Sequence, residues 1–206
     1  VSGNATYIAT FVPKYTIFAM SNGTSFGTVN GGGSYNQGDI VTLTANPNNG
    51  YGFDRWQDGN TDNPRNIVVS GNATYIATFV PKYTILVMNN DTSYGTVNGC
   101  GVYNEGSTVT ITANANYGYH FTHWNDGNTD NPRTINLTQD TTFTAYFEKN
   151  NYTITVVTNN NTMGQAYGGG IARFLDSLFI GATPNYGYRF TRWQDNNTDN
   201  SRVVQV

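Results

Sequence analysis

The sequence predicts an all-β protein, a tandem array of small repeat domains of about 68 residues with little or no helix. Three observations lead to this fold class: a composition of strand and turn formers, alternating apolar residues, and internal self-similarity. Gly, Asn, Thr and Tyr dominate the chain, whereas Leu, Glu and Lys are scarce. Because Thr and Tyr favour strands while Gly and Asn favour turns, this composition is typical of short strands joined by tight turns.

Self-similarity defines the domain organisation. The sequence SGNATYIATFVPKYTI begins at Ser2 and again at Ser70. The three tryptophans keep the same period, with one position added before the third: Trp56, Trp124 and Trp193. The one added residue is placed most simply near Asn150 and Asn151. We predict the last strand of a preceding repeat and then three repeats, the third lacking its last strand: residues 1–14, 15–82, 83–150 and 151–206.

The strands are easiest to recognise in the second repeat. The predicted strand segments, one of which contains Gly-rich turns, are 83–88, 94–106, 108–114, 118–124, 133–138 and 141–147. One face of the strictly alternating segment 108–114 is apolar: Val109, Ile111 and Ala113. The last strand has a matching apolar face: Phe143, Ala145 and Phe147. Between repeats, the last strand and the next first strand are expected to be separated by a short connection: Val80, Pro81 and Lys82.

The two ends of the chain are complementary in sequence. Residues 1–14 are identical to residues 69–82, the tail of the first repeat, and Val206 aligns with Val69, so the third repeat has no such tail. The candidate residues for strand exchange are Thr6, Tyr7, Ile8, Ala9, Thr10, Phe11 and Val12. Two explanations stay open. Donor-strand exchange between identical chains would join them head to tail into filaments; alternatively, the chain is a window on a longer array whose covalent neighbour supplies the strand.

The third repeat departs from the pattern in its middle. Residues 171–180 keep the flanking Gly triplet and Pro-Asn in register but lose the alternation of the other repeats, and residues 172–179 have the spacing of an amphipathic helix. The change is abrupt. It is explained either by a compensated frameshift or an error in the assigned sequence, or by a divergent strand.

An acidic loop follows each tryptophan, as in W-Q-D-G-N-T-D-N-P-R at 56–65. Its D-x-N-x-D spacing matches the opening of a calcium loop, and the candidate ligands are Asp58, Asn60, Asp62, Asp126, Asn128, Asp130, Asp195, Asn197 and Asp199. The match then fails, because the sixth position is Asn instead of Gly and the twelfth is Val or Leu instead of Glu. We therefore favour a turn, with no cofactor, and keep calcium as the alternative.

The tryptophans themselves are predicted to be core residues. A β unit of this size has few large apolar side chains, and each Trp recurs together with a Phe three positions earlier: Phe53, Phe121 and Phe190. Stacking of the tryptophans on sugars is the alternative. A carbohydrate-binding module would need a flat aromatic row, for which Tyr35 and Tyr103 are candidates, although the third repeat has Ala172 in that position.

Other function classes have little support. Charged residues make up 11% of the chain and the net charge is −3, so there is no basic surface for nucleic acid. The sequence contains no run of about 18 apolar residues, so no transmembrane helix is predicted. His120 and His123 occur only in the second repeat and, being three apart on a strand, are expected to face opposite sides. Cys100 aligns with glycines, and no catalytic set is present, so we expect no enzyme activity.

The joint pattern resembles the divergent internalin B-repeat family. The residues that carry the resemblance are an opening Y-T-I, a G-T-V turn, EG-x-x-V-T-I-T-A, GY-x-F-x-x-W-x-DG and a closing A-x-F. The Asn- and Thr-rich style is most similar to Bacteroidota surface proteins. The resemblance implies small domains similar to a β-grasp or β-sandwich, an extracellular or cell-surface location, and no catalysis.

Two functions follow from the pattern. The first is a structural array that forms a stalk or filament for adhesion or surface display. Its expected partners are neighbouring repeats of the same or an identical chain, together with host or microbial glycans or surface proteins. The alternative is a set of carbohydrate-binding repeat modules in a secreted polysaccharide-processing protein.

Overall fold

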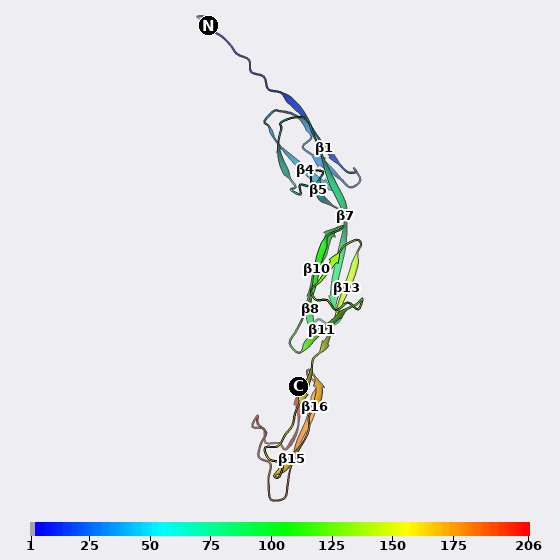
Figure 1. The fold of residues 1–206 in the computed structure, drawn as a ribbon, viewed down its shortest axis with the longest axis vertical. Coiled ribbons are helices and arrows are strands. Elements are labelled where there is room, and N and C mark those ends of the chain that lie inside the picture. The colour runs from blue at the N-terminus through cyan, green and yellow to red at the C-terminus, as the bar shows by residue number, and fades with distance from the viewer. Residues whose placement is uncertain (1–2) are drawn as a thin grey trace. The chain divides into compact units, whose positions relative to one another are not determined.

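The structure is a computed structural model, and it describes residues 3–206. Within that range the chain forms eighteen β-strands and no helix (Figure 1). There is accordingly no helix among these residues that is long and apolar enough to cross a membrane. The predicted all-β class is confirmed, since the strands of residues 3–206 form five sheets of two to seven strands.

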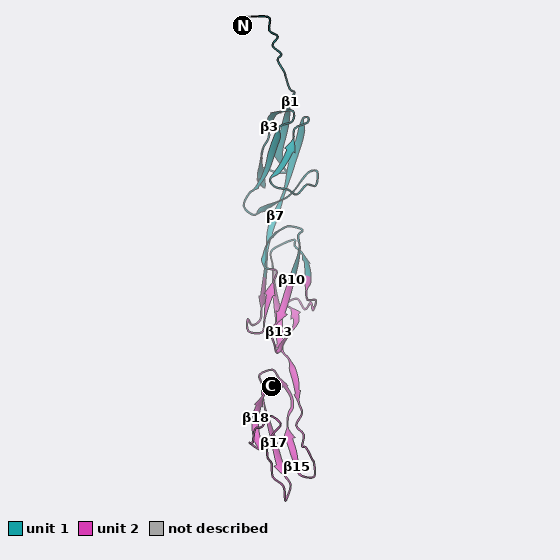
Figure 2. Ribbon diagram, turned by 90° about the vertical axis from the view of Figure 1, so that its left-hand side faces the viewer, with its two compact units in different colours: residues 1–86, 100–110, 134–141 teal, residues 87–99, 111–133, 142–206 magenta. Residues whose placement is uncertain are grey.

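The chain divides into two compact units, and the division runs through the second repeat (Figure 2). Unit 1 contains the first repeat and part of the second: residues 1–86, 100–110 and 134–141. Unit 2 contains the remainder of the second repeat and the whole third repeat: residues 87–99, 111–133 and 142–206.

The first repeat consists of two sheets. One sheet has the order β5–β7–β1–β3, formed by Tyr51–Trp56, Ala73–Asn89, Lys14–Ser21 and Gly33–Asn36. The other has the order β2–β4–β6, formed by Gly27–Asn30, Ile40–Pro47 and Arg65–Val68. The first part of β7 lies between two partners, since β1 pairs with it in parallel and β5 pairs with it antiparallel. We call this part of β7 the closing strand of the repeat.

The core of the first repeat is centred on its tryptophan. Trp56 and Leu43 are completely buried, and the buried cluster around them is Ile17, Val41, Ala45, Ile67, Val69, Ala77 and Phe79. Burying side chains of this size stabilises the fold by about 1.5–3 kcal/mol each. The prediction that tryptophan is a core residue is confirmed for Trp56 and also for Trp124, which is equally buried.

A β-bulge explains how a Phe and a Trp three positions apart both reach the core. In β5, Phe53 pairs with Phe79 and Arg55 pairs with Thr78, so Asp54 is the extra residue of the bulge. The side-chain alternation is shifted by one at that point. Phe53 and Trp56 therefore point to the same side, with their rings 5.5 Å apart.

The same bulge occurs in the second repeat and corrects one prediction. In β11 (Tyr119–Trp124), His120 pairs with Glu148 and His123 pairs with Tyr146, both in β13 (Thr141–Lys149). Because Tyr146 and Glu148 are two residues apart, the two histidines lie on one face of the strand. The expectation that they face opposite sides was wrong, because strict alternation does not hold across a bulge.

The remaining elements of the second repeat are β8 (Gly95–Asn98), β9 (Gly101–Asn104), β10 (Thr108–Ala115) and β12 (Arg133–Asn136). Both predicted apolar faces are confirmed by burial. One is in β10, where Val109, Ile111 and Ala113 are at most 5% exposed. The other is in β13, where Phe143, Ala145 and Phe147 are at most 6% exposed.

The first connection between repeats is not a separate segment. Strand β7 runs without interruption from Ala73 to Asn89, through the predicted connection at residues 80–82. Its backbone groups there are satisfied, because the Lys82 N–H donates to the Gly50 carbonyl and the Pro81 carbonyl accepts from the Glu105 N–H. The proline has no N–H to satisfy, so the strand continues past it. In unit 2, by contrast, Asn150 separates the end of β13 from the start of β14, near the position predicted for the extra residue.

In the third repeat, the segment 172–179, which has the spacing of an amphipathic helix, lies in two strands and the turn between them. The elements of this repeat are β14 (Asn151–Ile154), β15 (Gly164–Gly168), β16 (Gly170–Arg173), β17 (Ser177–Pro184) and β18 (Ser201–Gln205). β16 and β17 are joined by a tight turn in which Leu175 has a φ of 64°. The equivalent residues Gly38 and Gly106 have φ of 91° and 76°. The turn geometry is thus kept, but with a residue for which the left-handed region is unfavourable.

Candidate functional site

The closing strand seals each complete repeat. In the first repeat it places Ala77 and Phe79 in the core, where they are 0% and 2% exposed. In the second repeat β13 places Ala145 and Phe147 in the same way, at 0% and 1%. The small residue lies opposite the tryptophan and the ring packs edge-on against the preceding phenylalanine, Phe53 or Phe121, so the A-x-F pattern fills the core at alternate positions.

An asparagine side chain clamps the closing strand, a feature that the sequence analysis missed. The Asn22 side-chain N–H donates to the Phe79 carbonyl (3.1 Å), and its side-chain oxygen accepts from the Phe79 N–H (3.0 Å). Asn90 makes the same pair of bonds with Phe147, both at 3.0 Å. The amide thus imitates a neighbouring strand. The one signal in the sequence is the recurrence of this asparagine at the same place in each repeat.

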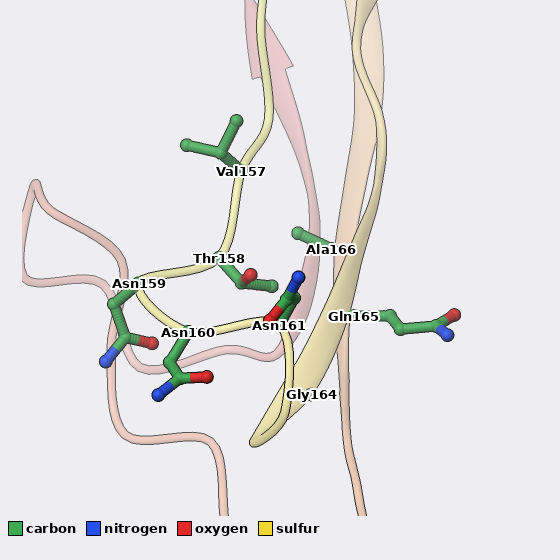
Figure 3. A pocket seen from close by; sticks show the side chains of 8 residues that line it. All are labelled: Val157, Thr158, Asn159, Asn160, Asn161, Gly164, Gln165 and Ala166. Carbon is green, nitrogen blue, oxygen red and sulfur yellow. The ribbon is translucent and has the colours of Figure 1, made fainter.

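The third repeat has a groove in the place of its closing strand. The groove has a volume of about 610 Å³. Its walls come from the segment after β14, from β15 and β17, and from residues 188–194. Figure 3 shows an adjoining pocket that shares Asn159, Gln165 and Ala166 with this groove, with Ala166 and Gln165 on opposite sides of β15 and Asn159 on the adjoining loop. Asn159 is the equivalent of the clamp residues Asn22 and Asn90.

The residues that a closing strand would contact are altered in the third repeat. Residues 188–193, the equivalent of β5, form no strand. β14 ends at Ile154 after four residues, whereas its equivalent β1 has eight. Trp193 is half-buried, in contrast to the fully buried Trp56. The prediction of a strand at residues 188–193 and the prediction that Trp193 is a core residue are therefore wrong. Among the described residues, none forms the closing strand that would pair with residues 188–193 and cover the tryptophan.

The predicted exchange segment lies at the other end of the described residues. Residues 4–12 belong to no strand, and all of their side chains are exposed. The exposure of its large apolar side chains is 82% for Tyr7, 86% for Ile8, 88% for Phe11 and 56% for Val12. A run of apolar side chains with unpaired backbone is the kind of segment that adds to an open sheet edge.

The comparison with protein families identifies what kind of repeat this is. The model of the divergent InlB B-repeat domain matches three consecutive segments, residues 18–83, 85–151 and 152–206. The chain belongs to this family. No match was found among curated proteins or solved structures. The resemblance inferred from the sequence is confirmed, and so is its fold expectation of small tandem β domains.

In each B-repeat the acidic loop is held together by its own side chains. Both carboxylate oxygens of Asp58 accept from Arg65 Nη1 at 2.9 Å. The Asn60 side-chain oxygen accepts from the Asp62 N–H at 3.0 Å. The Trp56 indole N–H donates to the Asp62 carbonyl at 2.8 Å. A cation at this loop would have to displace an arginine from Asp58, so the loop is built as a turn that anchors the tryptophan.

The loop recurs with the same partners in the other two B-repeats. Asp126 accepts from Arg133 at 2.8 and 2.6 Å, and Asp195 accepts from Arg202. The remaining members repeat the backbone bonds: Asn128, Asp130, Asn197 and Asp199. Residues 3–206 contain no cluster of three or more His, Cys, Asp or Glu side chains placed to hold a metal ion.

The arginines also set the electrostatics of the loops. The hydrogen bond from Arg133 holds the pKa of Asp126 below its ordinary value of 3.8. Arg202 lowers the pKa of Asp195 in the same way. Desolvation would by itself raise the pKa of Asp58, but the hydrogen bond and charge of Arg65 outweigh it and the net shift is downward. These aspartates are ionised at neutral pH and act as ion-pair partners.

The arginines stack on rings of the closing strand as well. The Arg65 guanidinium carbon lies 5.2 Å from the ring of Tyr75, and that of Arg133 lies 4.9 Å from Phe143. In the third B-repeat, no closing strand among residues 3–206 supplies such a ring. There, Arg202 Nε is buried without a hydrogen-bond partner.

The tyrosines considered for sugar binding, and one of the two histidines, contact neighbouring groups of the protein. The Tyr35 hydroxyl donates to the Gly31 carbonyl (3.0 Å), and the Tyr103 hydroxyl donates to the Cys100 carbonyl (3.4 Å). Both rings are half-buried over their own turns, and Tyr35 packs against the core. Neither presents a flat exposed platform. His123 stacks on Tyr146 with the ring centroids 4.9 Å apart.

Proposed function

We propose that this chain is a non-enzymatic structural array of B-repeats, which forms a stalk or filament at the bacterial cell surface for adhesion or display. The tandem B-repeats support this, because such arrays extend by stacking small domains that need only their neighbours. The side chains that recur in every repeat, those of the acidic loop and the tryptophan, bind to one another within the same repeat. The proposed partners are neighbouring repeats and surface molecules outside the chain.

We further propose that the array is joined head to tail by strand complementation. In this joint, residues 5–12 of one copy fill the groove of the third repeat in another. The observation that carries the proposal is the match between the two: the segment Ala5–Val12 has the same sequence as Ala73–Val80, which closes the first repeat. The groove is lined by the equivalents of residues that flank the closing strand in the first repeat, so we expect it to take that sequence in the same register.

The register follows from the closed repeat. Ala5 pairs in parallel with Ile154, as Ala73 pairs with Ile17. On the other side, Ala9 lies opposite Trp193, as Ala77 lies opposite Trp56. The docked Phe11 then lies opposite Phe190, as Phe79 lies opposite Phe53 in the core of the first repeat.

Two polar side chains of the third repeat, Asn159 in the groove and Arg202 outside its lining, gain partners in this arrangement. The Asn159 amide clamps the Phe11 backbone in the manner of Asn22 on Phe79. The ring of Tyr7 comes to lie over Arg202, as that of Tyr75 lies over Arg65. Main-chain bonds supply the affinity of such an added strand, and the alternate pockets supply its specificity.

A peptide of residues 3–14 tests the groove. The receptor is the chain with Ala9→Asp and Phe11→Asp, whose own exposed segment no longer fits a core. The peptide is expected to protect the amides of residues 154–158 and 188–193, between which it docks, from hydrogen exchange. The same peptide with both Asp substitutions is the matched control and should give no protection. Absence of protection by the unaltered peptide would overturn strand complementation.

Substitution of the clamp residue Asn159 tests the proposed register in the same peptide-binding experiment. Asn159→Ala removes two hydrogen bonds to the docked strand, so peptide binding should weaken by about 1–3 kcal/mol. Asn161→Ala changes a nearby asparagine that is not the equivalent of Asn22 or Asn90, and it should leave the affinity for the peptide unchanged. Equal effects of the two substitutions would contradict the proposed register.

Electron microscopy and intact mass test the array itself. We expect filaments that are lost when residues 1–12 are deleted, in material whose mass is near 22.6 kDa. Filaments that survive the deletion, or material of much larger mass, would instead support repeats joined within one long chain.

A further inference from the structure

We propose that His120 and His123 form a surface site for a divalent transition metal ion of the zinc type, bound through the Nε2 atoms of both rings. The site lies on the outer face of β11 in the second repeat, and its residues are the two histidines of the chain. It goes beyond the structural array proposed above and does not depend on strand complementation.

The β-bulge of β11 brings the two histidines to the spacing of a chelate. Their partners across the sheet, Glu148 for His120 and Tyr146 for His123, are two residues apart on β13. The two histidines are therefore spaced like residues i and i+2 of a regular strand, with their Cβ atoms about 7 Å apart. Two imidazoles on one face at this spacing can reach the same ion, since zinc binds ring nitrogens at about 2 Å. Without the bulge, residues three apart would face opposite sides and could not share an ion.

The hydrogen bond of His120 fixes which of its ring nitrogens carries the proton. Nδ1 of His120 lies 2.8 Å from the side-chain oxygen of Asn150. An amide oxygen only accepts hydrogen bonds, so Nδ1 holds the hydrogen and donates it. A neutral imidazole has a single N–H, and Nε2 therefore keeps its lone pair. Because His120 is exposed, this lone pair is open to an ion from solvent.

A two-step hydrogen-bond chain gives His123 the same tautomer. The Thr122 hydroxyl donates its hydrogen to the Tyr146 carbonyl at 3.0 Å. The same hydroxyl oxygen lies 2.9 Å from Nδ1 of His123, so it accepts from that nitrogen and leaves Nε2 with the lone pair. Tyr146 stacks on the face of the His123 ring, with the centroids 4.9 Å and the planes 6° apart. A metal ion binds in the plane of the ring, so this stacking holds the ring without covering the ligand atom.

Two imidazoles with hydrogen-bonded Nδ1 atoms are the donor set of a zinc-type ion. Metal-binding histidines donate their other ring N–H to a neighbouring acceptor, which fixes the tautomer and the ring orientation. Imidazole nitrogen suits zinc, copper and nickel, whereas calcium and magnesium prefer oxygen. The exposed carboxylate of Glu148, opposite His120, adds negative charge beside the site. Residues 3–206 supply no third ligand of the His, Cys, Asp or Glu type, so water completes the coordination.

The other two repeats lack the site. The first repeat has Gly52 and Arg55 at the equivalent positions, and the third has Arg189 and Arg192. An arginine side chain remains protonated and has no lone pair for a metal ion. We therefore expect one ion per chain, bound at the second repeat.

Equilibrium dialysis of the full chain against Zn²⁺ tests the site. The chain carries no histidine tag and has Cys100→Ser, because a thiolate also binds zinc. We expect saturation at one zinc ion per chain, with no competition from an excess of Ca²⁺. His120→Gln and His123→Gln each leave a single imidazole, so saturation at one ion per chain should be lost from the same concentration range in either variant.

Substitution of the hydrogen-bond acceptor of His120 tests the assigned tautomer. Asn150→Ala leaves both ligands in place but removes the group that holds Nδ1–H of His120, so the zinc affinity should fall about tenfold or more. Asn151→Ala changes the next asparagine, which makes no contact with either histidine, and should leave the affinity unchanged. Equal affinities of the two variants for zinc would overturn the role of Asn150 and the tautomer that it fixes.

Three outcomes would overturn the metal site. They are the absence of zinc binding by the parent chain, full affinity in either single histidine variant, and binding at one ion per chain in the double variant. Circular dichroism of the variants without metal should match that of the parent, since both rings lie on the outer face of the sheet. The chain with Ala9→Asp and Phe11→Asp should bind zinc like the parent, so this site and strand complementation fail separately.

Discussion

The first and third repeats carry the same acidic loop in two different surroundings. The indole N–H donates to a loop carbonyl in both, at 2.8 Å from Trp56 and 2.7 Å from Trp193. The neighbouring Phe lies 5.5 Å and 5.2 Å from the indole in the two repeats. Yet Trp56 is fully buried, whereas Trp193 is half-buried at the edge of a groove.

This difference separates local from non-local structure. The loop forms in both repeats because the hydrogen bonds of its tryptophan indole and of its aspartate–arginine pair join residues at most seven positions apart. Burial of the tryptophan needs the closing strand, which comes from much further along the chain, where Ala77 pairs with Trp56. The third repeat therefore has the B-repeat turn without the complete B-repeat core, which makes it the acceptor of the proposed joint.

Truncating the tryptophans should produce the largest difference between the two repeats. Trp56→Ala removes the centre of a closed core and should destabilise the first repeat by about 3–5 kcal/mol. Trp193→Ala removes a half-buried ring and should cost the third repeat less than half as much, because the buried area lost is smaller. Hydrogen exchange of β4 and of β17 measures each repeat separately.

The peptide of residues 3–14 sharpens this test. Once the groove is filled, Trp193 becomes a core residue, and the cost of Trp193→Ala should rise toward that of Trp56→Ala. If the two substitutions cost the same without peptide, the contrast between the closed and open repeats would be wrong.

The turn at Leu175 should give a smaller effect of opposite sign. Leu175→Gly relieves a left-handed backbone conformation and should stabilise the third repeat by about 1 kcal/mol. The reverse change, Gly106→Leu, should destabilise the second repeat. Thermal unfolding followed by hydrogen exchange of β17 measures the first effect, and a loss of stability in Leu175→Gly would mean that the leucine side chain contributes more than its backbone costs.

The ion pair of the acidic loop should give the smallest effect. The pKa of Asp126 is lowered in the folded state, so its contribution is present above pH 3.8 and is lost as the pH falls through the folded-state pKa. Asp126→Asn should therefore lower the stability at pH 7 by less than about 1 kcal/mol, because the pair is partly exposed. Urea unfolding at pH 7 and pH 2 should show the difference vanish at the lower pH. A difference that persists at pH 2 would indicate a role other than ion pairing.

Much of the fold could be predicted from the sequence because it depends on periodicity. The apolar alternation of β10 and β13 identified their buried faces, and the recurring D-G pair identified the turn after each of the first two tryptophans. The bulge in β5 and β11 was missed, since an inserted residue changes which side chains share a face without leaving a composition signal. The amide clamps of Asn22 and Asn90 were missed because their partners are 57 residues away.

The sequence by itself determined the repeat, its family, its strands and the complementary ends, since these follow from periodicity and identity along the chain. Only the tertiary structure decided that the closing strand lies between β1 and β5, that an asparagine clamps it, and that the third repeat holds a groove in its place. Those features depend on which segments pair across long separations. Backbone hydrogen bonds and core packing select that pairing, and neither can be read from neighbouring residues alone.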